Sequence, residues 1–152
     1  MWWPGDASQW REAHNTAGAT ATSPRWIVAE GEVSNPPAVA PGQPPVDTGA
    51  WDTYVLIANT GAHAGTVRIT LMLEGRLTVP IVASHTQVEA NSRTTFSLRD
   101  LLATAGIYAA RAAVLVESVG GDLPLVVERA MYRSRQGQFD AGMNGLGTPL
   151  TP

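Results

Sequence analysis

The stretch Thr66-Val-Arg-Ile-Thr-Leu-Met-Leu-Glu74 alternates apolar and polar side chains along most of its length. In an extended chain, the valine, isoleucine and leucines at the odd positions from Val67 to Leu73 share one face, and Arg68 lies on the other with the threonines. A period of two predicts a strand with one buried face and one wet face, the usual state in an antiparallel sheet.

The same kind of pattern recurs along the chain. Further strands are predicted at Arg25–Glu32, Trp51–Asn59, Thr78–Val82, Ser92–Leu98, Arg111–Ser118, Leu123–Arg133 and Gln138–Leu146. The turn cluster Asn59–Gly65 predicts a hairpin between its neighbouring strands, Gly120-Gly-Asp122 a tight turn, and Arg99–Ala105 a helical turn. We therefore expect an all-β fold, an antiparallel β-sandwich that is Ig-like or jelly-roll-like, with about 7–9 strands and at most one short helical turn.

Composition supports one globular domain and excludes several function classes. The 152 residues are 44% hydrophobic and 15% charged, well away from the composition of disordered chains. The absence of cysteine excludes disulfides, thiolate metal sites and a cysteine nucleophile. A net charge of −3 argues against nucleic-acid binding. No apolar run is long enough for a membrane span, and no signal-peptide pattern is visible.

The segment Ser34–Ala50 interrupts the strand pattern with five prolines. Proline lacks the N–H donor of a sheet ladder, so this Pro-rich segment is either a linker between domains or a long loop within one. We favour the loop, because the predicted strand Arg25–Glu32 needs the rest of the chain as its domain.

The two ends of the chain resemble each other about 130 residues apart. The matched pairs, with one residue of slack, are Met1-Trp2 with Met131-Tyr132, Trp10 with Phe139, Asn15 with Asn144, and Gly18 with Gly147. We expect residues 1–24 to be the tail of a preceding repeat or a strand-donating segment, 25–148 to be the sandwich module and 149–152 to be a C-terminal tail.

Several short motifs resemble tandem β-sandwich repeat modules of bacterial secreted or surface proteins. The motifs are Trp26 with Ala29-Glu-Gly31, Tyr54 to Ala58-Asn59, Leu73-Glu-Gly75, Asn91-Ser-Arg93 and Val127-Glu-Arg-Ala-Met-Tyr132. More distantly, the chain resembles the cytoplasmic sensory-rhodopsin transducer proteins. The first resemblance implies a non-catalytic structural or adhesive unit, extracellular or at the cell surface, that packs against neighbouring modules. The second implies a cytoplasmic signalling adaptor and homo-oligomer.

Candidate catalytic and metal-binding residues are few. The histidines His14, His63 and His85 share no ligand spacing, and Ser84 and His85 lie on opposite faces of a strand. We predict no enzyme activity, no metal and no cofactor. Arg129 is expected to face the edge of the core and to pair with Glu30 or Glu117, because a buried charge needs a partner.

Aromatic residues are the remaining candidates. We expect Trp2, Trp3, Trp10 and Tyr132 to contact a neighbouring module or another partner. A carbohydrate-binding module is the alternative, with Trp10 or Trp51 stacking on a sugar ring. Because residues 1–20 duplicate a strand that the module already has, we predict self-association through them, in a homo-oligomer or a filament-like assembly.

Overall fold

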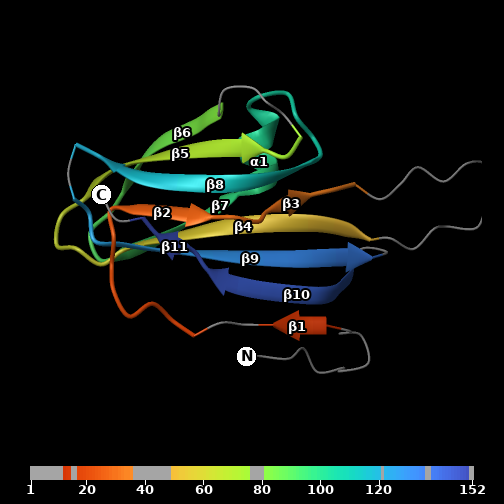
Figure 1. The fold of residues 1–152 in the computed structure, drawn as a ribbon, viewed down its shortest axis with the longest axis horizontal. Helices are drawn as coiled ribbons and strands as arrows, with labels where there is room; N and C mark the ends of the chain where they lie inside the picture. Colours follow the sequence, from red (N-terminus) through yellow and green to blue (C-terminus); the bar gives the residue numbers. More distant parts are fainter. Residues whose placement is uncertain are drawn as a thin grey trace, which may run out of the picture.

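The computed structural model describes residues 12–14, 17–35, 49–75, 81–120, 122–135 and 138–150, with the backbone alone at 12–14 and 81–84. Within these residues, the chain forms two packed β-sheets and one short helix (Figure 1). Sheet A has the strand order β1 (Glu12–His14), β10 (Gln138–Leu146), β9 (Leu125–Arg135), β4 (Ala50–Asn59) and β7 (Ser92–Ser97).

Sheet B has the strand order β11 (Thr148–Pro149), β2 (Arg25–Val28), β8 (Ala110–Val119), β5 (Gly65–Leu73) and β6 (Ile81–Val88), and β3 (Glu32–Val33) pairs with β8 beyond the end of β2. Every pair except β1–β10 is antiparallel. The predicted all-β sandwich is therefore confirmed. The strands beyond the predicted number are β1, β3 and β11, which are too short to show a period.

The alternating residues of the opening stretch do form the core. Val67, Ile69 and Leu71 of β5 are fully buried against residues of sheet A such as Val55 and Ile57. The largest core side chain is Trp26 on β2, whose Nε1 donates to the carbonyl oxygens of Ser23 and Leu125, each at 2.9 Å. The contact with Leu125 ties sheet B to the first residue of β9 in sheet A.

The predicted hairpin around Asn59–Gly65 is wrong, because β4 belongs to sheet A and β5 to sheet B. Asn59 is 1% exposed and fixes this crossing between sheets. Its Nδ2 donates to the carbonyl oxygens of His63 (2.9 Å) and Glu89 (3.0 Å), and its Oδ1 accepts from Gly61 N (2.9 Å). The turn is thereby attached to the β6–β7 connection. Gly120–Asp122 likewise joins strands of different sheets, β8 and β9.

The predicted helical turn is present as α1 (Leu98–Ala103), which joins β7 in sheet A to β8 in sheet B. The side chain of Ser97 caps it by accepting from Asp100 N at 3.3 Å. Its leucines Leu98, Leu101 and Leu102 are buried in the core. Figure 1 shows α1 behind β5 and β8, where it covers the core between the sheets.

Two boundaries differ from the sequence prediction. β6 extends to Val88, beyond the predicted end at Val82, because this edge strand alternates polar side chains that mask its pattern. Pro149 and Leu150, which we expected in a C-terminal tail, lie along β2, where Leu150 N donates to Arg25 O at 2.9 Å.

The two ends of the Pro-rich segment lie side by side, since Ser34 N donates to Trp51 O at 3.0 Å.

Candidate functional site

Sheet B contains a β-bulge where β2 gives way to β3. Val28 pairs with Val114 and Glu32 with Arg111, so residues 29–31 oppose only residues 112 and 113 of β8. The extra residue bends the strand, and Glu30 at this bend is exposed to solvent. Gly31 is buried at this point, and a Cβ added to it would lie 2.8 Å from Leu98 Cδ2.

The bulge brings Glu30 to Arg129. Arg129 lies on the inner face of β9, opposite the buried Val55, and Glu128 lies on the outer face. Arg129 Nη1 donates to Glu30 Oε2 at 3.0 Å and to Glu30 O at 3.1 Å. The Arg129 side chain is 14% exposed and its Nε has no partner, whereas the Glu30 side chain is 80% exposed.

Glu117, the other carboxylate that we considered for Arg129, lies on the outer face of sheet B. Arg25 Nε donates to Glu117 Oε1 at 3.1 Å, and Arg68 Nη2 donates to Glu117 Oε2 at 2.7 Å. The three residues share one register row across β2, β8 and β5. We call Arg25, Glu117 and Arg68 the arginine-ended row.

A second row with the opposite sign pattern crosses the other end of the same face. Arg111 Nε donates to Glu32 Oε2 at 3.1 Å, and Arg111 Nη1 lies 3.8 Å from Glu74 Oε2. Glu74 N also donates to Arg111 O at 2.9 Å, which places Glu74 level with Arg111. We call Glu32, Arg111 and Glu74 the glutamate-ended row. The sequence shows neither row, because both depend on strand register.

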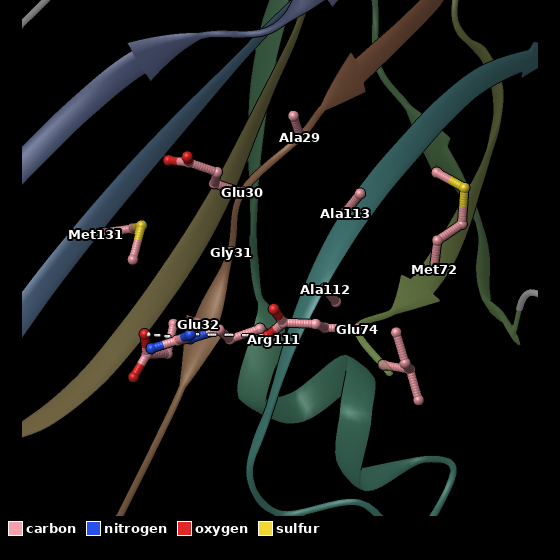
Figure 2. A pocket seen from close by; sticks show the side chains of 11 residues that line it. Ala29, Glu30, Gly31, Glu32, Met72, Glu74, Arg111, Ala112, Ala113 and Met131 are labelled. Carbon is pink, nitrogen blue, oxygen red and sulfur yellow. Dashed lines mark hydrogen bonds and ion pairs between the residues drawn. The ribbon is translucent and has the colours of Figure 1, made fainter. Parts of the chain in front are cut away.

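A pocket of about 540 Å³ lies beside the glutamate-ended row (Figure 2). Small residues of the bulge and of β8, namely Ala29, Gly31, Ala112 and Ala113, form part of its lining. Met72 lines it from β5, and Met131 lines it from sheet A. Figure 2 shows Arg111 crossing toward Glu32 below Ala113. The pocket is thus lined by small apolar residues of the bulge and of β8, with the charged side chains of the glutamate-ended row at one end.

The predicted aromatic contacts lie on sheet A. Tyr132 on the outer face contacts Tyr54, with ring centroids 6.0 Å apart, and Phe139, with centroids 5.5 Å apart. Phe139 is 51% exposed. We call Tyr54, Tyr132 and Phe139 the aromatic row. The other predicted contact residues, Trp2, Trp3 and Trp10, lie outside the described residues.

Trp51, considered for sugar stacking, contacts a charged pair. The guanidinium carbon of Arg133 lies 5.8 Å from the Trp51 ring centroid, and Arg133 Nε donates to Asp140 Oδ1 at 2.9 Å. An arginine already occupies a position over this ring. Sugar binding at Trp51 stays a prediction.

The N-terminal strand lies beside its sequence counterpart. β1 pairs in parallel with β10, and the partners are Glu12 with Ala141, Ala13 with Gly142, and His14 with Met143. These partners differ by 129 in residue number, as do Trp10 and Phe139, or Asn15 and Asn144, in the repeat. The two like segments are therefore paired in the register of the repeat itself.

Among the described residues, no group of three or more histidine, aspartate or glutamate side chains could hold a metal ion. His63 and His85 are exposed. No helix of the described chain is both long and apolar enough to cross a membrane.

The fold and these surfaces define a small two-sheet β protein. No family model and no curated protein matches the sequence. Solved structures that are similar in fold include the following two. One is protein 1070 of Thermotoga maritima, with a TM-score of 0.61 and 17% identity over 87% of this chain and 97% of that one. The other is the Anabaena sensory rhodopsin transducer, with a TM-score of 0.50 and 23% identity over 75% of this chain and 99% of that one. The predicted resemblance to the transducer is confirmed for the fold, whereas no comparison supports the resemblance to secreted tandem repeats.

Proposed function

We propose that this protein is a non-catalytic interaction module that associates with copies of itself by exchanging its N-terminal strand. The observation that carries the proposal is the parallel pairing of β1 with β10 in the register of the sequence repeat. The repeat matches Trp10 with Phe139 and Asn15 with Asn144 in sequence, at the same offset as these strand partners. The structure has β1 on its own module, and the same edge of β10 can accept β1 from a second copy.

Exchange of an identical strand keeps every contact of the paired edge. The ladder between β1 and β10 is made by backbone groups, which are the same whether β1 comes from the same copy or from another. The described part of β1 pairs with Ala141 to Met143 alone, out of the nine residues of β10. Backbone groups elsewhere along that edge favour further pairing.

The aromatic row supports binding of a protein partner on the same sheet. Tyr132 and Phe139 lie on β9 and β10, next to the β1 edge, and aromatic rings are enriched where proteins bind one another. In its finer form, the proposal is a structural or adhesive unit of an extracellular or cell-surface protein.

A signalling adaptor is the second candidate, and the fold likeness to the Anabaena sensory rhodopsin transducer favours it. In that case, the protein is cytoplasmic and its partner is a membrane receptor. Titration against a detergent-solubilised sensory rhodopsin by calorimetry tests this candidate. Saturable binding that is lost in Phe139→Ser supports it, and no binding heat contradicts it for that receptor.

Light scattering of the purified chain tests the proposal directly. We expect the intact protein to form an assembly larger than one chain, and both deletion of residues 1–20 and Ala13→Pro to reduce its mass, because proline removes a strand donor. Ala13→Ser is the matched control and is expected to keep the assembly. An unchanged mass in the deletion and the proline variant refutes strand exchange.

A further inference from the structure

The outer face of sheet B carries two rows of charges, and the sign on each strand in one row is opposite to the sign on that strand in the other. The arginine-ended row reads plus, minus, plus across β2, β8 and β5, and the glutamate-ended row reads minus, plus, minus across β3, β8 and the end of β5. Halfway between the two charged rows lie Val28, Val114 and Leu71, which are register partners on β2, β8 and β5. We call the position of these three residues along the strands the midpoint. Glu117 and Arg111 are each three residues from Val114, and Arg68 and Glu74 are each three residues from Leu71.

We propose that a second copy of this chain docks face to face on the outer face of sheet B, related by a two-fold axis that runs across the strands through this midpoint. Such an axis reverses strand direction and keeps each strand over its own counterpart. It therefore places Glu117 against the partner copy's arginine at position 111, and Arg68 against the glutamate at position 74. Arg25 likewise faces the glutamate at position 32, so each of the three charged columns, along β2 with β3, along β8 and along β5, brings opposite charges together.

Side-chain size is matched by the same operation. Leu115 and Ile27 lie one residue from the midpoint on the arginine side, and Ala113 and Ala29 lie one residue from it on the glutamate side. The axis puts each large side chain over a small one. The pocket of about 540 Å³ lined by Ala29, Ala113 and Met72 is the hollow that would receive them. Alternating large and small residues is how packed faces interdigitate.

The pattern favours a copy of this chain over other occupants. The two rows carry net charges of +1 and −1, so an elongated ligand of one sign meets repulsion at one end. A two-fold axis along the strands would instead set like rows against each other. With a rise of about 3.4 Å per residue and strands about 4.8 Å apart, the strands of sheet B cover roughly 570 Å², a footprint somewhat below the roughly 800 Å² that one partner buries in a standard interface.

This interface goes beyond strand exchange, because it uses the opposite sheet and needs no residue of β1. Charge reversal tests it on the full chain. We expect E74R to place two arginines together and R68E to place two glutamates together, so each variant loses the face-to-face step and the mass of its assembly halves. When the two variants are mixed, Arg68 meets Glu74 and the new arginine meets the new glutamate, so the lost step returns.

Native mass spectrometry of the 1:1 mixture identifies the pairs by mass. We expect E74R·R68E pairs in at least tenfold excess over the two like pairs. E89R and R93E, which change exposed residues on the β6–β7 turn and on β7, form the matched control and should mix statistically. The proposal is overturned if E74R and R68E alone keep the wild-type mass, or if their mixture pairs statistically. Strand exchange predicts that the variants pair without regard to the charges at positions 68 and 74. Failure of one proposal therefore leaves the other intact.

Discussion

Asn59 shows how one side chain decides a connection. Its amide bonds to the turn that follows it and to the β6–β7 connection, and both partners of its Nδ2 are backbone carbonyls. The same asparagine at the end of a strand is also typical of a hairpin turn, so sequence alone favours the wrong connection. The burial of the Asn59 side chain distinguishes the crossing between sheets from a hairpin.

We predict that Asn59→Ala lowers the free energy of unfolding by about 2–3 kcal/mol, because it leaves buried backbone groups without partners. Urea denaturation followed by circular dichroism measures the loss. Asn144→Ala, at an exposed position of β10, is the control and should stay within about 0.5 kcal/mol of wild type. Equal effects of the two substitutions contradict this role for Asn59.

Arg129 leads to a different prediction. Its Nε is buried without a partner, and the carboxylate that it pairs with is mostly in water. Replacing it by methionine removes the unpaired donor and leaves Glu30 solvated, so we expect Arg129→Met to change the free energy of unfolding by less than about 1 kcal/mol. Thermal and urea unfolding measure this change. A loss above about 3 kcal/mol would mean that the pair with Glu30 is a major source of stability.

At the scale of elements, period-two burial predicts most strands correctly. β5, β8 and β9 could be predicted because each has a buried face that selects apolar residues at alternate positions. Strand pairing could not be predicted, since turn residues look alike in hairpins and in crossings between sheets. The charge rows could not be predicted for the same reason: their members come from three strands and meet only through register.

The repeat also hides a difference between its two copies. Gly147 is buried, and a Cβ there would lie 3.1 Å from Val127 O and 3.2 Å from Ile27 O, whereas nothing lies within 4 Å of a Cβ at Gly18. We therefore predict that Gly147→Ala destabilises the fold by about 1–2 kcal/mol and that Gly18→Ala is neutral within about 0.5 kcal/mol. Differential scanning calorimetry checks both. A neutral Gly147→Ala would show that the backbone of both sheets can move apart.

At the scale of the whole molecule, association is expected to use two surfaces of different character. Strand exchange on sheet A depends on backbone hydrogen bonds, and docking on sheet B depends on facing charge rows. Salt screens exposed charges strongly and backbone ladders little.

We therefore predict that raising NaCl from about 0.05 M to about 0.5 M weakens the sheet B step severalfold and spares strand exchange. Sedimentation velocity at both salt concentrations measures the dissociation constant of wild type and of E74R. The wild-type constant should rise with salt, and E74R should show little salt dependence. An equal salt response in both proteins contradicts the role of the charge rows.

The most direct test of strand exchange uses the absence of cysteine from the chain. His14 and Met143 are register partners in the β1–β10 pair, so cysteines at these positions can form a disulfide. Mixing His14→Cys with Met143→Cys chains under mild oxidation should yield a disulfide-linked species at twice the 16.0 kDa chain mass, well above the amount that either variant forms alone. If the double variant closes the disulfide within one chain and the mixture yields no linked pair, β1 stays on its own module and the proposed exchange is contradicted.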